Sequence, residues 1–395
     1  MNVKVIPYII YRSVLSLYVV CLLGCSPDVE EPAFKRTVLV YMSADNSLSH
    51  FSHTNMESIL KGAANDYLNG GNLLIYTDPV DDVPQLVEVE KGAGGVIGKK
   101  IVKTYPEQNS ASQEVMRSVI DEVFSSGQYV ADSYGLILWS HGSAWLPSDY
   151  ADYLRSFGQD GNSHMEINVL KETLPDHVFD FIIFDACYMA SVEVAYALRD
   201  KAGYIMASPT EILGEGLPYQ QIVRYLFANE PVHQLLTRIG LTFYTYYNEQ
   251  QAGTAYPASA SISVVRTEAL QELKEVCKAI FPGKEEEIFQ LDVSTLQRLD
   301  YLSANFKYNA LYDFGDFVSH LASTEAYSRY LESMKKVIVY KETTEKAYYG
   351  AGGGTTFPID KSRFCGISSY VPQRPLAALN EWYKQLDWYK AVYEE

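Results

Sequence analysis

The sequence predicts an α/β fold in which a mostly parallel central sheet lies between two layers of helices. Five short runs are apolar on both faces and end in polar or reactive residues: 37–42, 72–76, 134–139, 179–184 and 204–207. Stretches of helical pattern lie between several of them: 112–124, 166–174 and 189–199. Buried parallel strands form continuous apolar runs because helices cover both faces of their sheet. We therefore expect a three-layer α/β/α sandwich.

The composition is that of a folded, acidic protein. Of its 395 residues, 47% are hydrophobic and 21% are charged, which is too apolar for a disordered chain. The 32 Lys and Arg residues against 49 Asp and Glu give a net charge of −17. Nucleic-acid binding draws on an excess of positive charge, so we expect no nucleic-acid partner.

The N-terminus has the features of an export signal. Lys4 and Arg12 supply positive charge before an apolar run at 14–23, which is shorter than the about 20 residues of a comfortable membrane span. The run ends in a motif that resembles a bacterial lipobox, Leu22-Leu23-Gly24-Cys25. We therefore expect residues 1–24 to be a lipoprotein signal peptide and Cys25 to carry the lipid. The alternative is an ordinary secretory signal with an incidental Cys.

This N-terminus predicts where the protein resides and how it is divided. Residues 25–36 follow as the lipidated Cys and a polar tether, so the lipid is the expected membrane contact. The expected location is the bacterial cell envelope, at the outer membrane, with the periplasmic and surface faces both open. Residues 37–266 form the expected core.

The C-terminal region, 267–395, is expected to add helices and one late strand, packed on the core. Its helical stretches are 268–281, 313–323 and 326–336, and the strand is expected at 365–372. That strand offers a way back to the main sheet, so we do not treat the region as independent. We expect a monomer.

The cysteine count leaves an odd thiol. After Cys21 leaves with the signal and Cys25 is lipidated, three remain: Cys187, Cys277 and Cys365. At most one disulfide can form among them. Cys277 and Cys365 stand in apolar contexts and are expected to be buried free thiols, and a leftover thiol in an oxidising compartment is a candidate for chemistry.

Cys187 and His141 form the strongest candidate pair. They follow consecutive predicted strands, at the carboxyl ends where open α/β sheets bind ligands. Sequential strands are usually neighbours, so the imidazole and thiol are expected to face one another as a nucleophile pair. Gly142 would let the backbone come close to substrate, and its N–H with that of Cys187 would form an oxyanion hole. The alternatives are a structural histidine and a buried, inert cysteine.

The residues around this pair resemble a known family. The stretches His141-Gly142-Ser143-Ala144-Trp145 and 184–193, which contains Asp185-Ala186-Cys187, are similar to the clostripain family of cysteine peptidases. The likeness covers about 37–225 well and the C-terminal part loosely. It implies a caspase-like sheet, shared with caspases, legumains and gingipains, and C-terminal helical additions to it.

The resemblance also implies a reaction and its residues. It implies a cysteine endopeptidase that cleaves after Arg or Lys, with Cys187 as nucleophile and His141 as general acid/base. Asp185 matches the acidic residue of the basic-residue pocket, and Glu215 stands where a second acidic pocket residue is expected. Asp185 has the alternative role of a strand-end cap, and Glu215 that of a solvated turn residue.

Several relatives cut themselves after the catalytic histidine. Between His141 and Cys187 the basic residues are Arg155 and Lys171, and the loop-like context of Arg155 makes it the candidate for self-cleavage. The alternative is that Arg155 is an ordinary loop charge. The proposed chemistry requires no cofactor, and no metal-ligand spacing is present. Because some relatives need calcium, calcium stays undecided.

Two functions therefore follow from the sequence. The first is a lipid-anchored endopeptidase whose partners are protein or peptide substrates with basic residues. The second is a catalytically silent, caspase-like lipoprotein that binds peptides. The joint presence of His141, Gly142, Asp185 and Cys187 favours the first. A thiol-reactive peptide probe ending in Arg would distinguish them, because a binding module does not need an activated thiolate.

Overall fold

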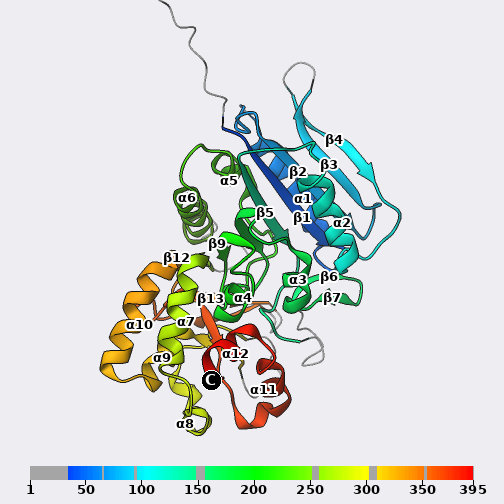
Figure 1. Ribbon diagram of the computed structural model, residues 1–395. Coiled ribbons are helices and arrows are strands. Elements are labelled where there is room, and N and C mark those ends of the chain that lie inside the picture. Colours follow the sequence, from blue (N-terminus) through cyan, green and yellow to red (C-terminus); the bar gives the residue numbers. More distant parts are fainter. Residues whose placement is uncertain are drawn as a thin grey trace, which may run out of the picture. The chain divides into compact units, whose positions relative to one another are not determined.

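A nine-stranded sheet crosses the computed structural model in the order β12-β10-β9-β8-β5-β1-β2-β3-β4 (Figure 1). The structure describes residues 34–64, 66–92, 96–147, 156–250, 258–301, 309–350 and 354–394. The expected signal peptide, Cys25 and Arg155 lie outside the described residues. The part from Phe34 to Glu395 forms one compact unit.

The five predicted strands form the parallel centre of this sheet. They are β1 (Arg36–Ala44), β2 (Asn72–Pro79), β5 (Ser133–Trp139), β8 (Phe179–Asp185) and β9 (Ala202–Ala207). Antiparallel strands extend both edges: β3 (Gln85–Lys91), β4 (Ile97–Thr104), β10 (Ser261–Arg266) and β12 (Ile338–Thr343). The mostly parallel sheet is confirmed, while its four outer strands were not predicted.

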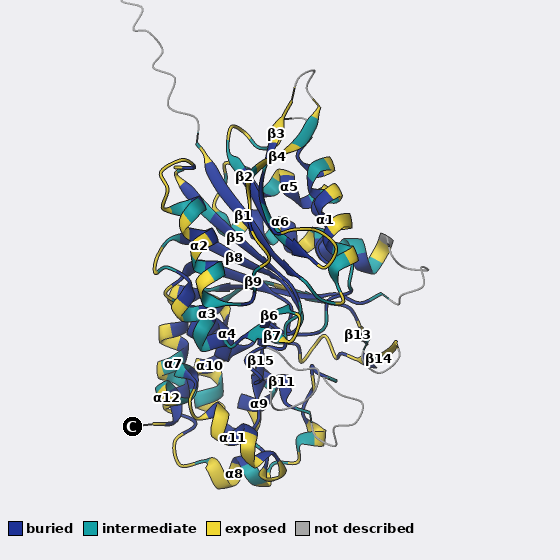
Figure 2. Ribbon diagram, turned by 90° about the vertical axis from the view of Figure 1, so that its right-hand side faces the viewer, coloured by how far each residue is buried: buried dark blue, intermediate teal, exposed yellow. Residues whose placement is uncertain are grey.

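Strand β1 shows how the two faces of the sheet are covered. Val38, Val40 and Met42 pack in the cluster that contains side chains of α1 (Ser49–Gly62), α5 (Tyr219–Leu226) and α6 (Val232–Thr245). Leu39 and Tyr41 pack in the opposite cluster, with α2 (Gln113–Phe124), α3 (Ile167–Thr173) and α4 (Val192–Ala197). Successive side chains of a strand point to opposite faces, so β1 serves both layers. Figure 2 shows the buried strands between these helices, and the three-layer sandwich is confirmed.

The helix expected at 189–199 begins later in the structure, at Val192. Ser191 is its N-cap, and the Ser191 side chain accepts a hydrogen bond from the Val194 N–H. Before it, the Ala190 N–H bonds to the carbonyl of Ser208. Because residues 188–190 pair with the segment after β9, they are unavailable to a helix.

The C-terminal region supplies both helices and an edge of the sheet. Its helices are α7 (Leu270–Lys278), α8 (Glu285–Gln290), α9 (Phe314–Leu321), α10 (Thr324–Val337), α11 (Ala377–Tyr383) and α12 (Asp387–Tyr393). The late strand β15 (Ser368–Tyr370) pairs with β11 (Leu311–Asp313) in a separate two-stranded sheet. The strand that joins the main sheet is β12 instead. The domain boundary at 266/267 stays a prediction.

Smaller elements complete the fold. Two hairpins are β6 (Phe157–Asp160) with β7 (Ser163–Met165), and β13 (Lys346–Tyr349) with β14 (Thr355–Pro358). Single helical turns are η3 (Tyr246–Gln250), η4 (Thr267–Ala269), η5 (Val293–Thr295) and η6 (Arg374–Leu376). Cys187, Cys277 and Cys365 are free thiols. Among the described residues, no helix is both long and apolar enough to cross a membrane.

Candidate active site

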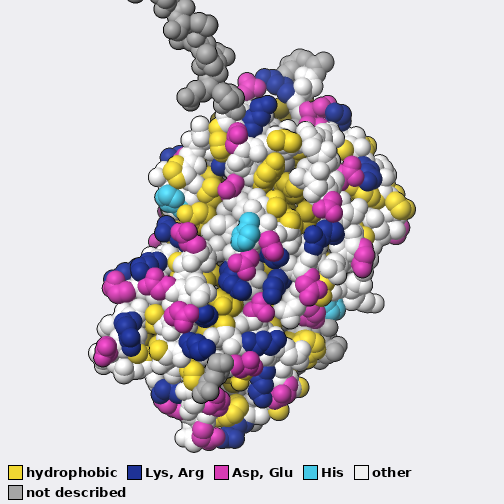
Figure 3. All heavy atoms as spheres, in the orientation of Figure 1, with side chains coloured by type: hydrophobic (Ala, Val, Ile, Leu, Met, Phe, Trp, Pro, Cys, Tyr) yellow, Lys and Arg dark blue, Asp and Glu magenta, His cyan; other side chains and the backbone are white. Residues whose placement is uncertain are grey.

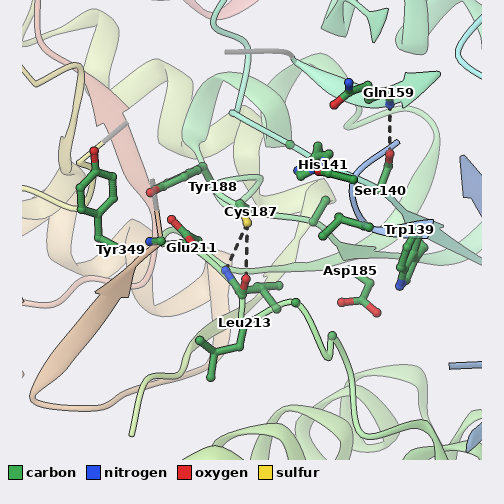
Figure 4. Close-up of a pocket in the computed structure, with 18 residues that line it drawn as sticks. Trp139, Ser140, His141, Gln159, Asp185, Cys187, Tyr188, Glu211, Leu213 and Tyr349 are labelled. Atoms are coloured by element: carbon green, nitrogen blue, oxygen red, sulfur yellow. Dashed lines mark hydrogen bonds between the residues drawn. The ribbon is translucent and has the colours of Figure 1, made fainter. Parts of the chain in front are cut away.

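Adjacent strands β5 and β8 bring the two candidate catalytic residues together. Trp139 and Asp185 are partners in the parallel register, so His141 and Cys187 each follow their strand by two residues at the same edge of the sheet. Both line one cavity of about 450 Å³, shown in Figure 4. This register confirms the expectation that the two strands are neighbours, while the pairing of thiol and imidazole stays a prediction.

The imidazole of His141 is held from the loop between β1 and α1. Its Nε2 lies 2.9 Å from the hydroxyl oxygen of Ser47, and its main-chain carbonyl accepts a hydrogen bond from the Gly158 N–H at 3.0 Å. The side chain is partly buried. Both the ring and the backbone of His141 are therefore fixed by elements outside β5.

Gly142 occupies a position with no room for a side chain. A Cβ atom there would lie 2.7 Å from the carbonyl oxygen of Cys187 and 3.0 Å from the sulfur of Met189. Glycine therefore lets the chain after His141 pass directly against the chain that carries Cys187. That Gly142 also lets the backbone come close to substrate stays a prediction.

The thiol of Cys187 is bonded to the backbone of Ile212. Its Sγ accepts a hydrogen bond from the Ile212 N–H at 3.3 Å and donates to the Ile212 carbonyl at 3.6 Å; both appear in Figure 4. Burial raises the pKa of the Cys187 thiol, and the negative charge of Glu211 raises it further. Both effects favour the protonated thiol over the thiolate.

The residue after the nucleophile candidate has an unusual backbone. Tyr188 has a φ of +64°, in the left-handed region that bulky side chains rarely adopt. Its N–H bonds to the carbonyl of Thr210 at 3.0 Å. This turn at the end of β8 sets Cys187 against the segment that follows β9.

Asp185 is a buried carboxyl group at the wall of the cavity. Its Oδ2 accepts hydrogen bonds from the Leu217 N–H at 3.1 Å and the Tyr219 hydroxyl at 2.8 Å. Burial raises the pKa of Asp185 to about 6, although these two hydrogen bonds act in the opposite direction and lower it. Gly216, with a φ of +68°, leaves space for the carboxyl, since a Cβ there would lie 2.7 Å from Oδ2. Asp185 thus both caps neighbouring backbone and faces the cavity.

Glu215 does not line the cavity, whereas Glu211 does. The main-chain carbonyl of Glu215 accepts a hydrogen bond from Asn55 at 2.9 Å. Glu211 accepts one from the Gly350 N–H at 3.0 Å, and burial raises its pKa to about 7. Figure 4 shows Glu211 and Asp185 on opposite sides of Cys187. Sequence analysis missed Glu211, although its place just beyond the end of β9 was a usable signal.

The described lining of the cavity carries acidic groups and no basic ones. Among its described lining residues none is Lys or Arg, and Asp185 and Glu211 are the two carboxyl groups. Within the described ranges, no group of three or more His, Cys, Asp or Glu side chains is arranged to hold a metal ion. An acidic cavity beside a thiol and an imidazole can bind a cationic group and carry out thiol chemistry next to it.

Comparison with known proteins decides the family. The model of the clostripain family, Peptidase C11, matches residues 40–395. The chain belongs to this family. A curated relative, clostripain of Hathewaya histolytica, is 26% identical over 229 residues, which cover 48% of this chain and 41% of that protein. The alignment thus spans less than half of that clostripain's length.

Two solved structures of C11 proteases resemble the chain over nearly its whole described length. An inactive zymogen C11 protease from Parabacteroides distasonis is 46% identical, with a TM-score of 0.82, covering 93% of this chain and all of that chain. A secreted C11 cysteine protease from Bacteroides thetaiotaomicron, in complex with an irreversible peptide inhibitor, is 33% identical, with a TM-score of 0.77, covering 91% and 98%. This clostripain-family chain is therefore a cysteine peptidase of the C11 family with its fold.

Proposed function

We propose that this protein is an endopeptidase that hydrolyses peptide bonds after Arg or Lys through Cys187 and His141. The observation that carries the proposal is one cavity in which a thiol, an imidazole and a buried carboxyl group meet. Relatives support it: clostripain is a family member, and one C11 protease is known with a peptide inhibitor bound.

The reaction follows from the groups at hand. His141 takes the proton of the Cys187 thiol, and the sulfur bonds to the scissile carbonyl carbon while an electron pair moves to the oxygen. The N–H groups of Gly142 and Cys187 receive that oxyanion. When the carbonyl re-forms, the C–N bond breaks and His141 gives its proton to the leaving amine. Water then attacks the thioester, with His141 taking its proton, and the released thiolate is reprotonated.

Asp185 supplies the preference for a basic residue. A buried carboxylate without a cationic partner is unfavourable, which the raised pKa of Asp185 reflects. A guanidinium or ammonium group of the substrate would provide the missing charge, so binding favours the ionised form. Glu215 does not line this cavity, so Asp185 is the group proposed to select Arg and Lys.

The test is hydrolysis of reporter peptides ending in Arg, Lys, Asp or Leu. We would use the protein from Ser26 onward, which contains the whole compact unit from Phe34 to Glu395, beside Cys187→Ala. The proposal expects turnover after Arg and Lys that Cys187→Ala abolishes. Turnover after Asp or Leu would reject the role of Asp185, and turnover by Cys187→Ala would reject the nucleophile.

The same proposal places the enzyme on a lipid anchor. The support is the lipobox-like Leu22-Leu23-Gly24-Cys25 after a short apolar run. We propose that Cys25 is lipidated and holds the protein at the bacterial cell envelope. Metabolic labelling with a fatty acid should mark the wild-type chain and leave Cys25→Ser unlabelled, and labelled Cys25→Ser would contradict the anchor.

We further propose that the enzyme matures by cleavage after Arg155. The support is the loop-like sequence around Arg155 and the zymogen state described for the Parabacteroides distasonis relative. Intact mass analysis should show two fragments joined without covalent linkage, and a single chain for Arg155→Ala. Cleavage that persists in Cys187→Ala and maps to another bond would contradict self-processing at Arg155.

A silent peptide-binding protein is the second candidate function. The observation that favours it is that the Cys187 thiol is bonded to both the N–H and the carbonyl of Ile212. Under this alternative, Arg peptides bind with equal affinity to the wild type and Cys187→Ala and are never cut, including after limited trypsin treatment around Arg155.

We propose that the protein is a monomer, that its partners are peptides and that it binds no nucleic acid. On the face shown in Figure 3, acidic and basic side chains are interspersed, without a broad basic patch. That pattern and the net charge of −17 support the exclusion of nucleic acid. Light scattering of the purified protein checks the monomer.

A further inference from the structure

Glu211 is a carboxyl group of the cavity that the proposed reaction does not use. It follows β9, whereas Asp185 ends the neighbouring strand β8, and both residues line the cavity that contains Cys187. Figure 4 shows the two carboxyl groups on opposite sides of the sulfur. A peptide whose scissile bond lies at Cys187 therefore has a carboxyl group on either side of it. Selection of one basic residue by Asp185 leaves the second carboxyl group without a task.

The carboxyl group of Glu211 is held in place by the hairpin of β13 and β14. Its Oε1 accepts a hydrogen bond at 3.0 Å from the N–H of Gly350, the residue that follows β13. Gly350 has no room for a side chain, because a Cβ atom there would lie 2.7 Å from the same oxygen. The backbone of a distant hairpin thus fixes this carboxyl group at the wall of the cavity.

This anchoring role does not require a carboxylate. One backbone N–H needs one acceptor, which the amide oxygen of a glutamine would also supply, whereas a carboxylate can accept about four hydrogen bonds. Burial raises the pKa of Glu211 to about 7, because a negative charge away from water is unfavourable unless a cation compensates it. Among the described lining residues, no Lys or Arg supplies that cation. A basic group of the substrate would supply it.

Two tyrosine rings lie on the same side of the cavity as Glu211. Tyr188 and Tyr349 both line the cavity, and Figure 4 shows them with Glu211 on the side of Cys187 away from Asp185. Aromatic rings attract Lys and Arg through the face of the ring, and a carboxylate pairs with the same groups. The combination suits an ammonium or guanidinium group, and it disfavours an acidic side chain.

We propose that Glu211 is a second specificity-determining residue, which binds a basic side chain next to the Arg or Lys after which the enzyme cleaves. The preferred substrate is then a peptide with two adjacent basic residues. The inference rests on the proposed function, because it takes the first basic residue to be held by Asp185 while Cys187 attacks. A cation bound at Glu211 also offsets the negative charge that raises the pKa of the Cys187 thiol.

The kinetic test uses three internally quenched peptides that each contain one Arg. In the first peptide Gln stands on both sides of the Arg, and in the other two Lys replaces the Gln before it or the Gln after it. Mass spectrometry restricts the measurement to cleavage after Arg. The readout is the ratio of kcat/KM between the better Lys peptide and the Gln peptide. One charge-assisted pair predicts a ratio of about tenfold in the wild type.

Three variants assign this ratio to a residue. Glu211→Gln keeps an acceptor for the Gly350 N–H but removes the charge, so the ratio should fall below about twofold. Glu215→Gln is the matched control, since Glu215 does not line the cavity, and should keep the tenfold ratio. Asp185→Asn should lower kcat/KM for all three peptides and leave the ratio unchanged.

A binding measurement reads the same preference without turnover. In Cys187→Ala, isothermal titration calorimetry should give about tenfold tighter binding of the better Lys peptide than of the Gln peptide. The double variant Cys187→Ala, Glu211→Gln should bind the two peptides with equal affinity. Circular dichroism checks that each variant is folded.

Either of two results would overturn the inference. One is a ratio near one in the wild type, and the other is a tenfold ratio that persists in folded Glu211→Gln. Cleavage after Arg without preference for a second basic residue would leave the proposed function intact. Absence of Cys187-dependent cleavage after Arg would instead reject the proposed function, and equal binding of the Lys and Gln peptides to Cys187→Ala would then overturn the inference by itself.

Discussion

His141 and Cys187 lie at the ends of neighbouring strands, yet the structure prepares them differently. His141 is partly buried, and its ring contacts a hydroxyl group in the cavity. Cys187 has its thiol bonded to the backbone of Ile212, near the carboxyl group of Glu211. The surroundings of His141 suit proton transfer, whereas those of Cys187 oppose formation of a thiolate.

For the proposed reaction, the surroundings of Cys187 have to change so that a thiolate can form. A thiolate needs a proton acceptor and a positive or polar environment. The bonds from Ile212 and the charge of Glu211 belong to the segment after β9, while the histidine side depends on β1 and β6. Variants on each side therefore test the comparison separately.

The largest expected effect is on the histidine side. His141→Ala removes the general acid/base and should lower kcat about 10³-fold. His53→Ala is the control, because His53 pairs with Asp81 in exposed surroundings and does not line the cavity. Steady-state kinetics on an Arg reporter measures both, and equal loss in the two variants would break the assignment.

Gly142→Ala should have the next largest effect. The added methyl group would meet the Cys187 carbonyl at 2.7 Å, and because this neighbour is backbone, the two strand ends must separate. A displacement of about 1 Å at a reacting centre lowers rates about 10²-fold. Gly98→Ala, which has open space around its Cβ, should leave kcat unchanged. Unchanged kcat in Gly142→Ala would show that the close approach is not needed.

Asp185→Asn sharpens the question of specificity. Loss of a charge-assisted pair should lower kcat/KM for Arg peptides about 10- to 100-fold. Glu215→Gln is the control, since Glu215 does not line the cavity, and should change kcat/KM by less than about twofold. If kcat/KM fell more in Glu215→Gln than in Asp185→Asn, Glu215 and not Asp185 would be the residue that selects Arg.

The raised pKa of Asp185 also predicts how stability depends on pH. In the folded protein this pKa is about 6, above the about 3.9 of an unfolded chain. The folded state therefore binds the proton more tightly, and this stabilisation is complete below pH about 4 and lost as pH rises through 6. At pH 8, Asp185→Asn should be more stable than the wild type by about 3 kcal/mol. Urea unfolding at pH 4 and pH 8 measures it, and an equal difference at both values would contradict it.

The smallest expected effect concerns the cysteine side. Glu211→Gln removes a negative charge that raises the pKa of Cys187, while its amide oxygen can still accept from the Gly350 N–H. Alkylation of Cys187 by iodoacetamide at pH 8 should become about threefold faster, since the thiolate is the reacting form. Glu215→Gln should alkylate at the wild-type rate. A slower reaction in Glu211→Gln would show that the carboxylate assists the thiol.

The centre of the fold was predictable because burial on both faces leaves a local pattern. The runs that became β1, β2, β5, β8 and β9 are continuous and apolar. Edge strands are less apolar and therefore harder to predict. Strand β4 contains Lys99, Lys100 and Lys103, which are typical of an exposed edge strand and not of a buried one. Strand β12 completes the opposite edge from a region expected to be helical.

The residues of the site also differ in whether the sequence could predict them. His141 and Cys187 were found because each directly follows a recognisable strand. Glu211 and Ser47 were missed because their contacts are with distant residues: Glu211 bonds to Gly350, 139 residues later, and Ser47 to His141, 94 residues later. No local pattern encodes these partners, although the position of Glu211 just beyond β9 marked it as a candidate. Glu215 stays a prediction as a pocket residue: Gly214 and Gly216 on either side of it line the cavity, while Glu215 itself does not.

Covalent labelling tests the central claim most directly. A peptide ending in Arg with a thiol-reactive ketone is incubated with the protein, and the modified residue is found by peptide mass mapping. The proposed function predicts one adduct, on Cys187, that is absent from Cys187→Ala and strongly reduced in His141→Ala. Adducts on Cys277 or Cys365 with Cys187 unmodified, or equal labelling in His141→Ala, would contradict a Cys187–His141 peptidase.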